Sequence, residues 1–245
     1  MPHPLSRRLA LGCAALLAAI AVASCGGGGD GGTAPFTGLW KGTLDGSRPV
    51  SAILLGDGSY YLKVAASDSA PAGLVRGTRD AQAEGFTSGD GVAYHFAYPP
   101  QAPTPVSISG TVEGRRTIAA TMDAAPLALA YDQAFDPDGS LADLAGSYPG
   151  EVTFSLGLRQ TVFEVTADGA LSTTLNGCSI TGEVVPRADR AFDLTIQFGG
   201  APCVFPGAVF AGAAIYSQPL QRLEAAVVNA ALGQAITFTA SRAAP

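Results

Sequence analysis

Four cysteines and two histidines are the residues of this 245-residue chain that are best suited to nucleophilic, redox or metal chemistry. A thiolate serves as a nucleophile or zinc ligand, and an imidazole serves as a base or ligand. These residues are Cys13, Cys25, Cys178, Cys203, His3 and His95. Three of these six residues, His3, Cys13 and Cys25, lie near the N-terminus, so the nature of that segment determines whether they can take part in such chemistry.

The first 24 residues have the pattern of a secretory signal peptide. Arg7 and Arg8 form a positive region, and Leu9–Ala23 is an apolar run of 15 residues. A membrane-spanning helix needs about 20 apolar residues, so this run predicts a cleaved signal and excludes a polytopic membrane protein. Cleavage would remove two positive charges and change the formal net charge from −6 to −8.

The end of this segment, Val22-Ala23-Ser24-Cys25, resembles the lipobox of bacterial lipoproteins. The resemblance implies cleavage before Cys25 and the attachment of palmitate and other acyl chains, which together anchor a protein firmly to a membrane. Gly26 stands where an Asp would imply retention at the inner membrane, so the resemblance implies the outer membrane, on its periplasmic side or at the cell surface. The alternative is an ordinary secretory signal with an incidental cysteine. Residues 25–36 are rich in Gly and predict a flexible tether.

Cleavage would remove His3 and Cys13, and lipidation would modify Cys25. Cys178 and Cys203 are then the only unmodified cysteines. In an oxidising compartment, an even pair of cysteines predicts a disulfide. Closing a loop of this size contributes roughly 3–4 kcal/mol in the chain-entropy model. The alternative, a redox pair, usually has the spacing Cys-x-x-Cys, which is absent here.

His95 is then the sole histidine, so a His-rich zinc site is impossible and we expect no metal and no cofactor. No Gly-x-Ser-x-Gly motif accompanies it, so we expect no catalytic residue. The acidic residues of Asp136–Asp143 predict a turn and linker rather than a calcium loop, whose spacing they do not match. The acidic net charge argues against binding nucleic acid. The chain is therefore predicted to be non-enzymatic, the alternative being an envelope enzyme with an unrecognised site.

The elements that position these residues are predicted to be strands. Short runs rich in Val, Ile, Thr, Phe and Tyr alternate with Gly-containing turns every 8–12 residues. We expect strands in the first half near 38–45, 49–55, 59–66, 74–79, 82–87, 92–98, 105–112, 116–122 and 127–132. In the second half we expect 147–154, 159–166, 170–175, 179–185, 191–198, 208–216, 221–228 and 234–241. Consecutive strands joined by tight turns favour antiparallel meanders, and closing them into barrels removes exposed edges.

The two halves repeat several landmarks in the same order, which predicts an internal duplication. Gly38-Leu39-Trp40 matches Gly146-Ser147-Tyr148, and Asp57-Gly58 matches Asp168-Gly169. Further matches join 106–112 to 209–214 and 116–120 to 222–226. We therefore predict an all-β chain with two tandem repeats of about eight strands each, at 37–134 and 145–242, with a linker at 135–144. Two small β-barrels and one combined barrel or sandwich both remain open.

Alternation within strands also predicts which side chains face the interior. In 92–98 the aromatic face holds Tyr94 and Phe96, opposite His95. In 192–198 the apolar face alternates with polar residues in the same way. We expect both apolar faces to point into the core.

The first match, Gly38-Leu39-Trp40, resembles the Gly-x-Trp of lipocalins, and Tyr148 stands at the matching place of the second repeat. This resemblance implies that Trp40 and Tyr148 are structural aromatics on the first strand of each repeat. It also implies a carrier of a small apolar molecule, which would need a cavity of about 300 Å³ or more. The whole layout of lipobox, tether and tandem barrels resembles surface lipoproteins of the transferrin-binding-protein B-like and factor H-binding families. That resemblance implies a lipid-anchored envelope protein that binds a protein partner or ligand.

Overall fold

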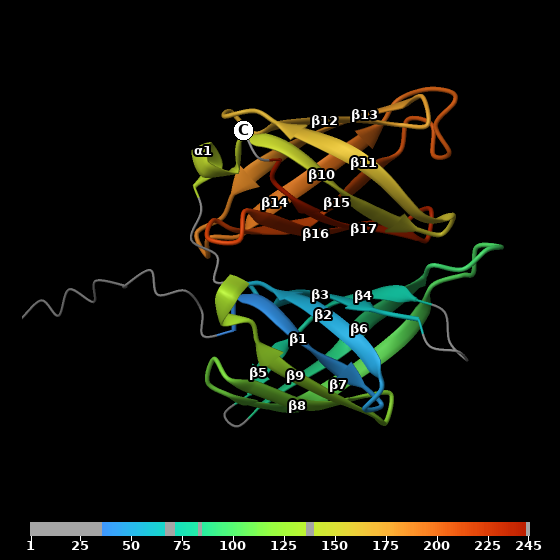
Figure 1. Ribbon diagram of the computed structural model, residues 1–245. Helices are drawn as coiled ribbons and strands as arrows, with labels where there is room; N and C mark the ends of the chain where they lie inside the picture. The colour runs from blue at the N-terminus through green and yellow to red at the C-terminus, as the bar shows by residue number, and fades with distance from the viewer. Residues whose placement is uncertain (1–35, 67–71, 83–84, 136–139, 244–245) are drawn as a thin grey trace, which may run out of the picture. The chain divides into compact units, whose positions relative to one another are not determined.

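The computed structural model describes residues 36–66, 72–82, 85–135 and 140–243. The predicted signal peptide, Cys25 and the predicted tether up to residue 35 lie outside these residues. The fold is all-β and consists of two antiparallel eight-stranded barrels in tandem, which confirms the predicted class and decides for two barrels (Figure 1).

The first barrel is an up-and-down meander that closes where β4 pairs with β6. Its short strand β5 follows β4 after Arg79 and pairs with the other half of β6, so β4 and β5 act together as one bent strand. The strands are β1 (Gly38–Leu44), β2 (Arg48–Leu54), β3 (Ser59–Val64), β4 (Gly73–Thr78), β5 (Asp80–Gln82), β6 (Gly85–His95), β7 (Thr104–Glu113), β8 (Thr117–Met122) and β9 (Ala125–Tyr131).

A bulge in β6 produces this bend. The pairing of β6 with β7 is irregular between Ser88 and Gly91, and the Asp90 carboxylate accepts a hydrogen bond from the Thr78 N–H at 2.9 Å. The Tyr60 hydroxyl bonds to buried Ser88 Oγ at 2.7 Å. The sequence predicted two separate strands, at 82–87 and 92–98, and this was wrong because the bulge keeps both segments within one strand.

The second barrel is closed by the pairing of its first strand with its last. Its strands are β10 (Gly146–Phe154), β11 (Gly157–Val165), β12 (Ala170–Leu175), β13 (Cys178–Pro186), β14 (Phe192–Phe198), β15 (Val209–Ser217), β16 (Arg222–Asn229) and β17 (Gln234–Ser241). Between the barrels lie the short helices η1 (Gln133–Phe135) and α1 (Leu141–Leu144). No helix in the part of the chain that the structure describes is long and apolar enough to cross a membrane.

The landmarks of the predicted repeat fall on corresponding elements of the two barrels. Gly58 and Gly169 occupy the same turn, after the second strand of each barrel, and have φ values of 91° and 89°. Both N–H groups donate to the carbonyl three residues earlier, at 3.1 and 3.0 Å. Left-handed φ values are the reason that a glycine stands at both positions. The duplication therefore appears as two barrels built from the same turn chemistry.

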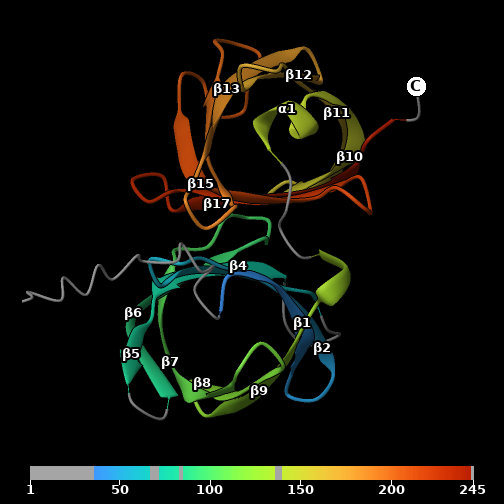
Figure 2. The ribbon, with the colours of Figure 1, turned by 90° about the vertical axis from the view of Figure 1, so that its left-hand side faces the viewer.

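Three apolar clusters organise the core. One fills the first barrel and another fills the second. A third, the inter-barrel cluster, joins outward-facing side chains of both barrels, namely Leu39, Ile53, Leu55, Tyr61, Leu74, Tyr94, Phe135, Ala191, Ala213, Ile215, Ala226 and Ala235. Figure 2 shows each barrel as a ring of strands, and Figures 1 and 2 together show α1 at one end of the second ring.

The two apolar faces that the sequence predicted are both buried in the core, but in different clusters. Phe192, Leu194, Ile196 and Phe198 do point into the second barrel, as expected. Tyr94, however, belongs to the inter-barrel cluster, whereas its neighbour Ala93 packs in the lumen. Alternation identifies the apolar face of a strand, but it does not say whether the lumen or a second domain covers that face.

Candidate functional site

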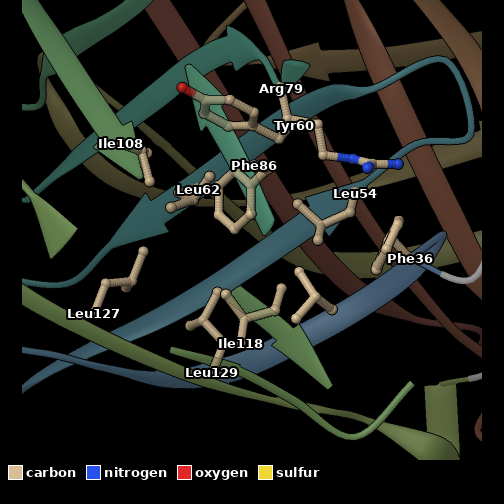
Figure 3. A pocket seen from close by; sticks show the side chains of 11 residues that line it. Phe36, Leu54, Tyr60, Leu62, Arg79, Phe86, Ile108, Ile118, Leu127 and Leu129 are labelled. Carbon is tan, nitrogen blue, oxygen red and sulfur yellow. The ribbon is translucent and has the colours of Figure 1, made fainter. Parts of the chain in front are cut away.

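The lumen of the first barrel is filled by side chains. Apolar residues from all around the wall converge on it, including Leu62, Phe86 and Ile118 (Figure 3). The remaining cavity has a volume of about 30 Å³. This is enough for one or two water molecules, but the lining is apolar and such small cavities stay dry.

Trp40 packs inside the first barrel. It is fully buried, its Nε1–H donates to the Phe36 carbonyl at 2.9 Å, and its ring meets Tyr131 edge-on at 5.3 Å. The Arg79 guanidinium lies over the Phe36 ring, 4.2 Å from its centroid, and burial lowers the pKa of Arg79. Trp40 lies on β1, the first strand of the first barrel.

Tyr148 occupies the matching place in the second barrel. It is also fully buried, and its hydroxyl donates to the Leu144 carbonyl at 2.7 Å, again four residues earlier in the chain. Burial is the main reason why the pKa of Tyr148 is raised, and the neighbouring Tyr216 raises it further. Since Leu144 belongs to α1, this bond holds the helix against the barrel. A capping box between Ser140 and Asp143 begins that helix.

The other end of the second barrel is closed by the loop that the disulfide holds. Cys178 and Cys203 are bonded, as predicted, with their Cα atoms 4.6 Å apart. The loop that follows Cys203 carries Phe205, which contacts Phe198 and Phe210 with ring centroids 5.5 Å apart. The cavity left in this lumen has a volume of about 20 Å³.

Larger hollows lie on the outside of the barrels. One, the Arg187 groove, has a volume of about 480 Å³ and is lined by residues of β3, β4, β14, β15 and β16 and of the turns beside them. A second, the lysine groove, has a volume of about 380 Å³ and lies against β1–β3 and β10, β16 and β17.

An ion-pair hub borders the first of these grooves. Arg187 contacts the carboxylates of Asp57 at 2.9 Å, Asp193 at 2.6 Å and Asp189 at 3.2 Å. Asp189 Oδ2 accepts the Gly56 N–H at 2.6 Å, so both barrels contribute to the hub. Burial alone would lower the pKa of Arg187, but its hydrogen bonds to Asp193 and Asp57 outweigh burial and raise it.

Asp57 is the residue that the first barrel supplies to Arg187. Burial alone would raise its pKa, but hydrogen bonds from the Ser59 N–H and from Arg187 outweigh burial and lower it. Asp57 and Arg187 are therefore both charged and paired at neutral pH.

The lysine groove contains the only two lysines of the chain, Lys41 and Lys63. On its other wall, Glu224 accepts hydrogen bonds from Arg222 and from Thr239, both at 2.6 Å. Charged groups of both signs thus line this groove.

Comparison with protein-family models, curated proteins and solved structures gives no match.

The other candidate residues from the sequence, His95 and the aspartates around the linker, do not form a common site in the part of the chain that the structure describes. His95 Nε2 lies 3.1 Å from Thr104 Oγ1, across the hairpin that joins β6 to β7. In the acidic stretch around the linker, Asp132 pairs with Lys41 at 2.7 Å, whereas Asp143 caps α1. Asp136 and Asp138 lie outside the described residues. Within the described ranges, no group of three or more His, Cys, Asp and Glu side chains is arranged to hold a metal ion.

Neither groove was predicted from the sequence. Arg187 and Asp57 stand 130 positions apart in the chain, and no local pattern connects them. The lysine row could have been predicted from the sequence. Two tight turns fix the register of β1, β2 and β3, and this register places Lys41, Ser51 and Lys63 opposite one another.

Proposed function

We propose that this chain is a lipid-anchored, non-enzymatic envelope protein that binds a protein partner through the outer surface of its two barrels. The observation that carries the proposal is that both lumens are filled. Their cavities of about 30 and 20 Å³ are roughly a tenth of what a drug-sized ligand needs. We therefore infer that a partner binds to the outer walls, where the two grooves of about 480 and 380 Å³ lie.

The same volumes count against the alternative of a lipocalin-like carrier. Trp40 is part of the cluster that fills the first barrel, and α1 and Phe205 close the two ends of the second. A small apolar molecule would have to displace these side chains before it could enter. The anchor rests on the lipobox resemblance of Val22-Ala23-Ser24-Cys25, and the outer membrane remains our proposal for its location.

Photocrosslinking in native envelopes tests the proposal. A photoreactive side chain at Thr195, exposed in the Arg187 groove, should yield a discrete protein adduct. The control is the same side chain at Thr174, which is exposed on β12 and lines neither groove. Equal adducts at both positions, or none at Thr195, would argue against binding at the groove.

The anchor is tested in the same preparation. The substitution Cys25→Ser removes the thiol that lipidation requires, so the protein should leave the membrane fraction. Unchanged membrane association of Cys25→Ser would contradict the proposed lipid anchor.

A further inference from the structure

The outer wall of the first barrel carries a row of three polar side chains from adjacent strands. Lys41 on β1 lies opposite Ser51 on β2, and Ser51 lies opposite Lys63 on β3. The sequence neighbours Trp40, Ala52 and Leu62 point into the lumen, so the three polar side chains point outward, where they line the lysine groove.

The spacing of this row leaves room for a ligand between the two ammonium groups. Neighbouring strands lie about 4.8 Å apart, which places the Cα atoms of Lys41 and Lys63 roughly 10 Å from each other. The small Ser51 side chain between them keeps the space open. Flexible lysine stems can bring both ammonium groups over the serine hydroxyl.

The donors of this row are largely unused. Among the described residues, neither Lys63 nor Ser51 has a side-chain hydrogen bond or ion pair. Lys41 pairs with Asp132 through one of its three N–H donors. These are the only lysines of an acidic chain, and both lie on one wall beside Ser51, where a single anion can contact both.

Two carboxylates, Glu224 and Glu151, also line the groove, and among the described residues neither forms an ion pair with Lys41 or Lys63. Both oxygens of Glu224 are occupied, by Arg222 and Thr239 at 2.6 Å each. Glu151 accepts a hydrogen bond from Gln160 at 3.0 Å.

We propose that the row of Lys41, Ser51 and Lys63 binds a phosphate group, either free or in the headgroup of a phospholipid. A phosphate carries up to two negative charges and directs oxygens toward three donors at once, whereas a carboxylate has two oxygens in one plane. Lysines bind phosphate as point charges and need no fixed fork geometry. This inference goes beyond the proposed function, since it needs neither the lipid anchor nor a protein partner.

The chain's two lysines make a direct test possible. Reductive methylation of the full-length Cys25→Ser protein with ¹³C-formaldehyde labels both lysines and keeps their charge. Titration with inorganic phosphate at constant ionic strength should shift both lysine signals along one saturable curve. Shifts that stay linear, or that equal those caused by chloride, would overturn the proposal.

Variants assign the binding to the row. Lys63→Gln and Ser51→Ala should each weaken phosphate binding, the former by about tenfold, whereas Arg159→Gln, on the exposed surface of β11, should leave it unchanged. Thermal melts of each variant separate lost binding from lost folding. Undiminished binding by folded Lys63→Gln would refute the site.

Vesicles distinguish the two sources of phosphate. If the row binds lipid headgroups, the Cys25→Ser protein will sediment with phosphatidylglycerol vesicles and Lys63→Gln will not. If it binds free phosphate alone, neither protein will sediment, and the phosphate titration will still saturate.

Discussion

Arg187 contacts carboxylates of both barrels. It holds three carboxylates, one of them on the first barrel, while its side chain is only 18% exposed. A buried charge of this kind is stable only as long as its partners stay ionised. The pairing of Arg187 with Asp57 should therefore make stability depend on pH.

We expect Asp57 to contribute to stability above its ordinary pKa and to lose that contribution in acid. Its pKa is lowered in the folded protein, so folding favours the ionised form. The contribution is complete above about pH 4, where the unfolded group is also ionised, and it disappears as the pH falls through the lowered folded value. Urea unfolding of wild type and Asp57→Asn between pH 2 and 7 measures it.

The two proteins should differ most at neutral pH and converge in acid. Asp45→Asn, at an exposed turn of the same barrel, is the control and should follow wild type throughout. A constant difference between wild type and Asp57→Asn at every pH would contradict the assignment.

At the scale of elements, the sequence predicted nearly every strand but not what covers them. Alternation and Gly turns located β10–β17 to within about two residues, because each strand has one apolar face and ends at a turn. The helix α1 was not predicted, since four residues carry no helical period. The grooves were not predicted either, because residues such as Arg187 and Asp57 meet only when both barrels are folded.

Gly77 of β4 packs closely against Tyr60, whose hydroxyl bonds to Ser88 beside the bulge in β6. The Tyr60 hydroxyl lies where a Cβ at Gly77 of β4 would stand. Gly77→Ala should therefore lower the free energy of unfolding by about 1–3 kcal/mol, as overpacking does in other cores. Urea denaturation measures the loss.

The matched control is Gly89→Ala in the adjoining strand, where a Cβ meets nothing within 4 Å. It should change stability by no more than about 0.5 kcal/mol. Tyr60→Leu withdraws the hydroxyl, so the double variant with Gly77→Ala should lose less than the sum of the two single losses. Strict additivity would show that the hydroxyl is not the obstacle.

For the whole molecule, the inter-barrel cluster makes two complete barrels behave as one unit. Each barrel has its own filled core, so each has the apolar burial that independent folding requires. Between them, Ala213 and Ile215 of β15 are fully buried although they lie on the outer wall. This cluster and the Arg187 hub should couple the unfolding of the barrels, so we expect one calorimetric transition for the wild type.

A charge placed in the inter-barrel cluster should uncouple the two barrels. Ala213→Glu would bury a carboxylate among apolar side chains, and directly opposite Asp193 in the strand pairing. An unpaired buried charge costs several kcal/mol, which the barrels avoid by separating while each keeps its own core. Scanning calorimetry should then show two transitions. Thr174→Glu, on the exposed wall of β12, should keep the single transition of the wild type. If Ala213→Glu instead melts in one transition at a lower temperature, at least one barrel depends on its neighbour in order to fold.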